Sequence, residues 1–175
     1  MKYSIFLLLT LSCFNIFGQV SNAQVSKTVY PVVYIDNIKS DVKEMHKINP
    51  ADIIDVAVFK GDAAINKIGP SGKDGLIYVQ TRNFVRNNYW KFLSSKSPEY
   101  AGAVATSNEA NDVQYVLNGH LITTNIEKTM GALTDKNFRS LVVINKEELN
   151  KEYKVKDKKY GIIILSDPRN SNPVN

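Results

Sequence analysis

Residues 61–82 read GDAAINKIGPSGKDGLIYVQTR, in which closely spaced glycines precede a strand-like run. The glycines are Gly69, Gly72 and Gly75. With Lys73 between two of them, they suggest a phosphate-binding loop. A P-loop, however, needs another glycine five positions before its Gly-Lys pair and a helix after it. Lys67 occupies that position here, and an apolar strand follows. The segment is therefore predicted to be a glycine turn that leads into a buried strand, and not a nucleotide site.

The same order of blocks occurs twice in the chain. The first set is VYIDNIKS (33–40), IDVAVFKGDAAINK (54–67) and DGLIYVQT (74–81). The second set is YVLNGHLI (115–122), SLVVINKEELNKEY (140–153) and YGIIILSD (160–167). The alignment matches Asp36-Asn37 with Asn118-Gly119, Lys60 with Lys146, and Gly75 with Gly161. Three blocks in the same order at nearly constant spacing indicate an internal duplication.

Each repeat is predicted to form a β-α-β-α-β unit. Asp, Asn and Gly tolerate positive φ angles, so the Asp-Asn and Asn-Gly pairs are expected to turn the chain after each first strand. In the first repeat the expected elements are a strand at 32–35, a helix at 40–48, a helical turn at Asn49-Pro50-Ala51-Asp52, a strand at 54–59, a helix at 62–66 ending in glycine and a strand at 76–79. In the second repeat the last two elements are expected at 147–153 and 162–165.

The fold class predicted from this pattern is α+β, with two tandem units whose small mixed sheets are flanked by short helices. Whether the two units share one sheet is left open. The expected organisation is a signal peptide at 1–23, a first unit at 24–83, an aromatic helix and linker at 84–112, a second, degenerate unit at 113–168 and a disordered tail at 169–175.

The first residues resemble an export signal. A basic start at Met1-Lys2 precedes an apolar run, and small residues end at Ala23, so the mature chain is expected to begin near Gln24. An uncleaved anchor is the alternative, but the run is shorter than the roughly 20 apolar residues that span a bilayer. The only cysteine, Cys13, lies inside this segment. Its flanking residues fit a lipoprotein signal poorly, so we expect a mature chain without disulfides or zinc-thiolate sites.

Between the repeats lies a cluster of aromatic residues. Tyr89, Trp90 and Phe92 fall within one helical turn, and residues 94–98 are expected to end that helix. The favoured interpretation is that the cluster packs between the two lobes. The alternative is an exposed partner-binding patch anchored by Trp90 and Tyr100. Residues 101–112 are rich in Ala, Ser and Asn, which is typical of a linker.

The first repeat resembles the plug domain of TonB-dependent outer-membrane receptors, in the form found in the SusC-like receptors of Bacteroidetes. The matching segments are PVVYIDN, INPADIIDVAVFKGDAAINKIG and GKDGLIYVQTR. The positions that fit the family pattern are Pro31, Tyr34, Asp36, Asn49, Pro50, Asp52, Ile53, Val58, Lys60, Ala64, Gly69, Gly75, Ile77 and Thr81. Asn37, Phe59 and Ile68 depart from it. The second repeat keeps mainly Asn118-Gly119, the strand to Lys146, and Gly161 with its two following isoleucines.

The resemblance implies a plug-like fold and a cell-envelope setting. No segment after Asp167 could supply strands of a membrane barrel, each of which takes about ten residues. We therefore expect a periplasmic or outer-membrane-associated binding or adaptor protein with an unidentified protein partner, not a transporter, and no membrane span after signal cleavage. A degenerate receptor fragment, or a small periplasmic enzyme with an unrecognised site, are the alternatives.

No pattern in the chain predicts catalytic, metal or cofactor residues. His46 and His120 are the only histidines, and neither has a second ligand at metal-binding spacing. Both are expected at the surface. The net charge of +5 is modest and its lysines are dispersed, so nucleic-acid binding is not expected.

Overall fold

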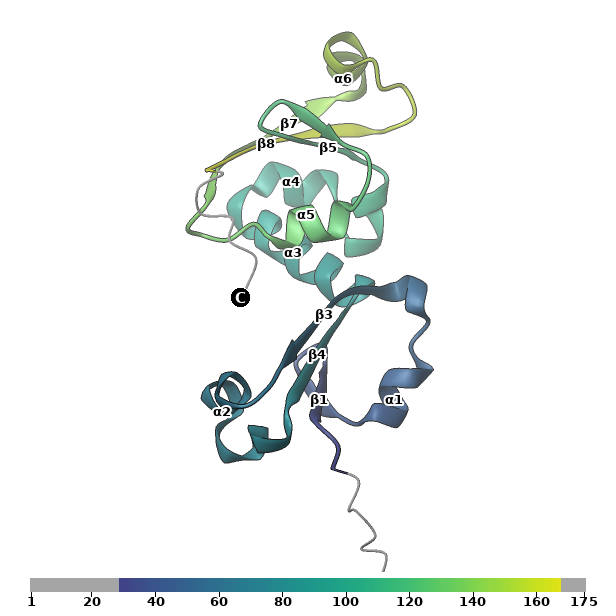
Figure 1. Cartoon of the computed structure of the whole chain (residues 1–175). Helices are drawn as coiled ribbons and strands as arrows, with labels where there is room; N and C mark the ends of the chain where they lie inside the picture. Colours follow the sequence, from purple (N-terminus) through teal and green to yellow (C-terminus); the bar gives the residue numbers. More distant parts are fainter. Residues whose placement is uncertain (1–28, 168–175) are drawn as a thin grey trace, which may run out of the picture.

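The computed structural model describes residues 29–167 and arranges them as two lobes joined end to end (Figure 1). The N-lobe comprises residues 29–81, and the C-lobe comprises residues 82–167. The predicted signal peptide with Cys13 and the predicted tail at 169–175 lie outside the described residues.

The N-lobe is built on a four-stranded mixed sheet. Its strands are β1 (Val32–Ile35), β2 (Ile38–Ser40), β3 (Ile53–Phe59) and β4 (Leu76–Thr81), in the order β2-β1-β4-β3. β1 pairs antiparallel with β2 and parallel with β4, and β3 pairs antiparallel with β4. The connections contain α1 (Val42–Lys47), the 3-10 turn η1 (Pro50–Asp52), α2 (Asp62–Ile68) and η2 (Gly69–Asp74).

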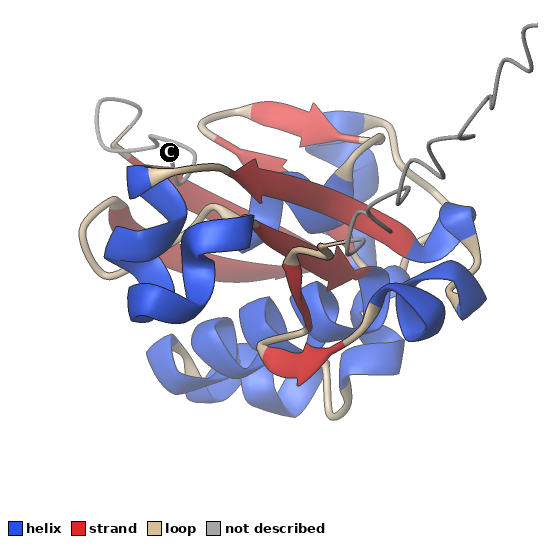
Figure 2. Cartoon of the chain, turned by 60° about the horizontal axis from the view of Figure 1, so that its bottom comes forward, coloured by secondary structure: helices blue, strands red, loops and turns tan. Residues whose placement is uncertain are grey.

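The C-lobe repeats this topology in a separate sheet. Its strands are β5 (Gln114–Leu117), β6 (His120–Ile122), β7 (Phe138–Asn145) and β8 (Tyr160–Ser166), in the order β6-β5-β8-β7 with matching directions. α5 (Ile126–Gly131) and α6 (Lys146–Tyr153) connect them. Short helices flank the strands in Figure 2. The predicted α+β fold with two small mixed sheets is therefore confirmed, and the two units do not share a sheet.

Local irregularities recur at matching places in the two sheets. Asp36 and Asn37 turn the chain between β1 and β2 with φ angles of 53° and 67°, and Asn118 and Gly119 do so between β5 and β6 with 51° and 82°. β3 and β7 each carry one irregularity in their pairing, between Ile53 and Asp55 and between Phe138 and Ser140. Shared turns and bulges at equivalent positions support the predicted duplication.

The predicted match between Gly75 and Gly161 was wrong by one residue. Phe59 and Ile144 are equivalent residues of β3 and β7. Phe59 pairs with Leu76, and Ile144 pairs with Gly161. The counterpart of Gly161 is therefore Leu76 and not Gly75. Gly75 lies before β4 with a φ of 99°, a conformation that favours glycine. Gly161 lies inside β8, where a β-carbon would stand 2.7 Å from Ile144 Cγ1. Gly75 is therefore favoured by its backbone conformation, and Gly161 by the close approach of the Ile144 side chain.

The predicted match between Lys60 and Lys146 is displaced in the same way. Asn145 is the last residue of β7 and the counterpart of Lys60, whereas Lys146 begins α6. Lys60 is an exposed residue of the loop between β3 and α2. Both alignments are displaced by the same single position, since the connection from Phe59 to Leu76 is as long as that from Ile144 to Gly161.

The segment between the two sheets is mostly helical. α3 (Arg82–Lys96) begins directly after β4, and α4 (Pro98–Ala103) and η3 (Ser107–Asn111) follow. Ser97 ends α3 and caps α4 by accepting a hydrogen bond from Tyr100 N. The expectation of a linker at 101–112 was wrong, because Val104 and Ala110 are fully buried. Small residues here allow close packing, which their composition alone did not distinguish from a linker.

Most of the fully buried apolar side chains lie in the C-lobe. The N-lobe contributes Val33, Ala64, Leu76 and Val79, and the C-lobe contributes Val85, Tyr89, Leu93, Tyr100, Val104, Ala110, Val113, Tyr115, Val116, Met130, Leu133, Leu149, Ile162 and Ile164. α3, α4 and α5 lie beneath the C-lobe sheet in Figure 1, on the side toward the N-lobe. The C-lobe therefore carries the larger core.

The aromatic cluster belongs to this C-lobe core. Tyr89 packs edge-on against Tyr115, and Phe92 packs edge-on against Phe138. From the N-lobe, the partly buried Ile54 packs against the same core. The prediction that the cluster packs between the lobes therefore holds in part: its ring contacts are with strands of the C-lobe, and Ile54 of the N-lobe packs against the same core.

Candidate functional site

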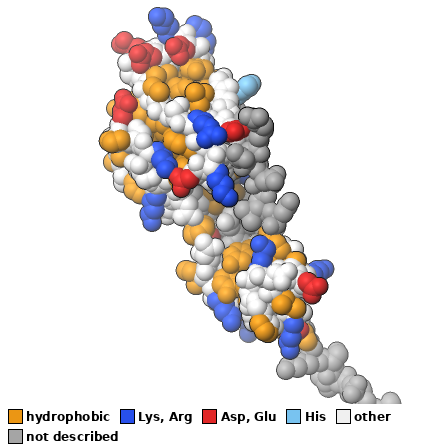
Figure 3. Space-filling model, turned by 90° about the vertical axis from the view of Figure 1, so that its left-hand side faces the viewer, with side chains coloured by type: hydrophobic (Ala, Val, Ile, Leu, Met, Phe, Trp, Pro, Cys, Tyr) orange, Lys and Arg blue, Asp and Glu red, His pale blue; other side chains and the backbone are white. Residues whose placement is uncertain are grey.

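A groove with a volume of about 960 Å³ lies between the two lobes. Its N-lobe wall is lined by Asn37, Ile54, Asp55, Val56, Ala57, Phe59, Lys67, Tyr78 and Gln80. Its C-lobe wall is lined by Val85, Asn88, Tyr89, Phe92, Glu127, Lys128, Gly131, Ala132, Leu133 and Thr134. Figure 3 shows the narrowing of the molecule between the lobes and the hydrophobic side chains exposed on both.

One face of the N-lobe sheet and its edge strand β3 form the first wall. Asp55 lies opposite Gln80 in the pairing of β3 with β4, and opposite residues share a sheet face. Tyr78 adds an aromatic ring to that face. Lys67 Nζ lies 4.3 Å from the centre of the Phe59 ring, at a distance that permits a cation–π contact. This wall combines aromatic surface with charged and amide groups, as ligand-binding surfaces do.

Helices α3 and α5 form the opposite wall. Asn88, Tyr89 and Phe92 lie at helical spacing along α3, and Glu127 and Lys128 are adjacent residues of α5. Asn88 and Lys128 are exposed, whereas Glu127 is buried. The exposed side chains of Asn88 and Lys128 can therefore reach a ligand, whereas the Glu127 carboxylate lies buried behind them.

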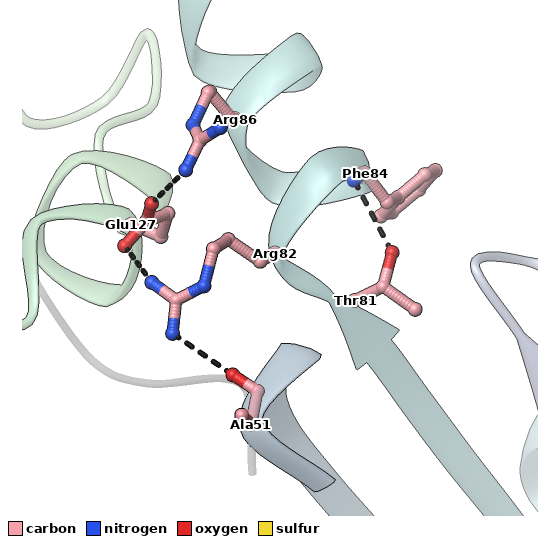
Figure 4. Close-up of polar contacts among 6 residues, drawn as sticks. All are labelled: Ala51, Thr81, Arg82, Phe84, Arg86 and Glu127. Atoms are coloured by element: carbon pink, nitrogen blue, oxygen red, sulfur yellow. Dashed lines mark hydrogen bonds and ion pairs between the residues drawn. The ribbon is translucent and has the colours of Figure 1, made fainter. Parts of the chain in front are cut away.

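An ionic cluster around Glu127 joins α5 to the start of α3 and, through Arg82, to the N-lobe (Figure 4). Arg82 Nη1 and Arg86 Nη2 each donate to Glu127, on opposite carboxylate oxygens, at 2.7 Å. Arg82 Nη2 also donates to the carbonyl oxygen of Ala51 in the N-lobe at 3.1 Å. The side chain of Glu127 is only 7% exposed and that of Arg86 is 12% exposed. A single carboxylate thus helps fix the angle between the lobes.

The arginines determine the charge state of Glu127. Burial alone would raise the pKa of this carboxyl, but the hydrogen bonds from Arg86 and Arg82 outweigh that effect and hold the pKa below its ordinary value of 4.5. Glu127 is therefore ionised at neutral pH and structurally engaged. It is not placed as a proton donor.

Three tyrosines meet beneath the groove. The hydroxyl groups of Tyr100 and Tyr115 lie 2.9 Å apart and share a hydrogen bond. The hydroxyl of Tyr89 has no hydrogen-bond partner among the described residues. Burial raises the pKa of Tyr89 to about 12 and raises the pKa values of Tyr100 and Tyr115 well above the ordinary value of 10. All three are therefore neutral at physiological pH.

The predicted turn residues form a matched clamp in each lobe. Asp36 Oδ1 accepts from Thr81 N, and Asp36 Oδ2 accepts from Thr81 Oγ1, both at 2.7 Å. In the C-lobe, Asn118 Oδ1 accepts from Ser166 N at 2.9 Å, and Asn118 Nδ2 donates to Ser166 Oγ at 3.2 Å. Each clamp ties the β-hairpin turn to the end of the last strand, so these motif residues are structural.

Other motif residues also take local structural places. Asn49 caps η1 by accepting from Ala51 N, with Pro50 at its first position and Asp52 at its end, which confirms the predicted helical turn. Gly69 ends α2 with a φ of 71°, as expected for a glycine after a helix. Apart from Asn37, none of the motif residues lines the groove.

The two proposed partner anchors are occupied within the C-lobe. Tyr100 is fully buried, so its prediction as an exposed contact was wrong. Trp90 is half-buried, and its Nε1 donates to the carbonyl oxygen of Val104 at 2.8 Å. An aromatic residue in a sequence can anchor a partner or fill a core, and here the helix orientation directs both side chains into the protein.

Neither histidine lines the groove. His46 and His120 are both exposed, and His120 Nδ1 lies 3.0 Å from the carbonyl oxygen of Asn118. Among residues 29–167, no group of three or more His, Cys, Asp or Glu side chains is placed to hold a metal ion. Within the same range, no helix is long and apolar enough to cross a membrane.

The chain was compared with protein-family models, curated proteins and solved structures. It matches none of them. The resemblance to receptor plug domains therefore stays a prediction from the sequence.

Sequence reasoning missed the ionic cluster. Arg82 and Arg86 are four positions apart on one helix, so they share a face, and this spacing was visible. Their partner Glu127 is more than forty positions away and has no pattern of its own. Only the packing of α5 against α3 brings the three together.

Proposed function

We propose that this protein is a non-catalytic binding module of the bacterial cell envelope, periplasmic or attached to the outer membrane, and that the groove between its lobes holds a protein partner. The observation that carries the proposal is the groove itself, which is about 960 Å³ in volume and lined by both lobes. The envelope setting rests on the sequence, through the export signal and the plug-domain resemblance.

The chemistry of the groove favours binding over catalysis. Its buried carboxylate, Glu127, is held by two arginines, and its buried hydroxyl, on Tyr89, has a raised pKa. Reactive groups need pKa values near the working pH and open access. The accessible polar groups include amides, lysines, Asp55 and the Thr134 hydroxyl, which recognise ligands through hydrogen bonds and charge.

A matched pair of α3 variants tests the groove. Asn88 lines it, and the adjacent Asn87 is exposed but does not line it. Affinity-tagged wild-type protein should recover a specific envelope protein from cross-linked cells, identified by mass spectrometry. Asn88→Arg should reduce its recovery at least ten-fold, whereas Asn87→Arg should leave it unchanged. Equal recovery with both variants, or fractionation of the protein to the cytoplasm, would refute the proposal.

A further inference from the structure

β3 is an edge strand of the N-lobe sheet. Within residues 29–167, the strand order β2-β1-β4-β3 leaves one side of β3 without a pairing strand. Edge strands present unpaired backbone N–H and C=O groups and can accept another strand. Val56 and Val58 on this strand are 49% and 58% exposed, so its side chains are accessible as well.

The groove follows this edge. Successive side chains of a strand point to opposite faces. A hollow over one face would therefore be lined by alternate residues. Beyond the pairing irregularity at Ile54, the consecutive residues Asp55, Val56 and Ala57 all line the groove. The groove therefore extends along the side of the strand, where an added strand would lie.

Positive side chains outnumber negative ones around the groove. Lys67 on the N-lobe side and Lys128 on the C-lobe side are both exposed. The buried Glu127 is outnumbered by Arg82 and Arg86. Among the described residues, Asp55 is the one other carboxylate in the lining. The summed charge is positive, which favours a negatively charged occupant.

We propose that an extended acidic segment of a partner protein adds to the N-lobe sheet as a fifth strand beside Val56–Phe59. Its backbone pairs with the free edge of β3. Its acidic side chains point toward Lys67 and Lys128, and the alternate apolar side chains lie beside Val56 and Val58. Such strand addition gives affinity through main-chain hydrogen bonds and specificity through alternate side chains. This inference rests on the proposed function and names the partner chemistry of the same groove.

Peptide binding tests the proposal directly. The probe is a fluorescein-labelled peptide that alternates glutamate with valine, and binding is measured by fluorescence anisotropy. We expect saturable binding, at least ten-fold weaker binding when lysine replaces glutamate, and loss of binding when alternate amides are N-methylated. Affinity that is unchanged by N-methylation, or no binding up to about 1 mM, would overturn the proposal.

The repeat supplies an internal control for where the peptide binds. β7 holds the same edge position in the C-lobe as β3 in the N-lobe. The peptide should slow hydrogen exchange in residues 53–60 and leave residues 138–145 unchanged. Combined Lys67→Glu and Lys128→Glu should weaken binding at least ten-fold, and Lys151→Glu on exposed α6 should not. Protection at β7 alone would refute the assignment to β3.

The outcomes separate this inference from the proposed function. Groove-dependent recovery of an envelope protein without strand-type peptide binding would leave the proposed function standing and refute strand addition. Peptide binding by a protein that is found in the cytoplasm would support strand addition and refute the proposed function.

Discussion

Thr81 makes three hydrogen bonds through its backbone nitrogen and its hydroxyl oxygen. Its backbone N–H and its hydroxyl both donate to Asp36, and its Oγ1 accepts from Phe84 N at 3.3 Å. The residue thus ends β4, begins α3 and holds the β1–β2 turn. Ser166 occupies the equivalent place in the C-lobe, where Asn118 replaces Asp36.

The two clamps predict which substitutions at Asp36 are tolerated. Asp36→Asn should change the free energy of unfolding by less than about 0.5 kcal/mol. The amide of Asn118 already forms the equivalent hydrogen bonds in the C-lobe, and asparagine tolerates positive φ. Asp36→Ala should cost about 2 kcal/mol, since it leaves Thr81 without its partner and puts alanine, which tolerates positive φ less well than Asp or Asn, at a φ of 53°. Urea unfolding of the two variants checks this, and equal losses would contradict it.

Gly72 is the glycine of the opening segment that packing makes necessary. A β-carbon there would lie 2.5 Å from the carbonyl oxygen of Ala64, a backbone atom of α2. Gly72→Ala should therefore destabilise the protein by about 2–3 kcal/mol in thermal or urea unfolding. Gly102→Ala is the matched control, because no atom lies within 4 Å of its added β-carbon. It should be neutral or slightly stabilising in α4. A similar loss in both variants would argue against this close approach.

At the scale of elements, Glu127 joins α5 to the start of α3. Glu127→Ala should lower the free energy of unfolding by about 3 kcal/mol, because it leaves the nearly buried Arg86 without its partner. Glu44→Gln, in the exposed pair with Lys47 on α1, should cost much less, because solvent screens that pair. Chemical unfolding at pH 7 measures both.

The lowered pKa of Glu127 gives this contribution a pH dependence. A carboxyl whose pKa is lower in the folded state stabilises the protein above its unfolded pKa and loses that effect as the pH falls through its folded value. The stability difference between wild type and Glu127→Gln should therefore be largest above the ordinary pKa of 4.5 and shrink below it. A difference that stays constant from pH 7 to pH 3 would contradict the ionic role.

Elements with strong local patterns were predicted well from the sequence, and short ones were not. The strand at 54–59, the cap at Asn49 and the glycine after α2 each depend on neighbouring residues, and the structure confirms all three. β2 and β6 were missed because three-residue strands are too short to show a period. The groove was beyond prediction, since it depends on the angle at which α3 leaves β4.

At the scale of the whole molecule, the two lobes differ in their ability to fold alone. The C-lobe has its own core under its sheet, whereas the N-lobe has four fully buried apolar side chains. Below about 60 residues a chain buries a small share of its surface and is marginally stable. A fragment of residues 81–167 should show a cooperative melt by circular dichroism, and a fragment of residues 29–81 should not. Cooperative unfolding of the N-lobe fragment would contradict this.

The direct passage from β4 into α3 affects how a partner would reach the groove. No residue separates the strand from the helix, and Arg82 bonds to both lobes immediately after the junction. The groove walls are thus fixed before any encounter, so little conformational freedom remains to be lost when a ligand arrives. Association would then be governed by diffusion and charge, without a slow closing step between collision and capture.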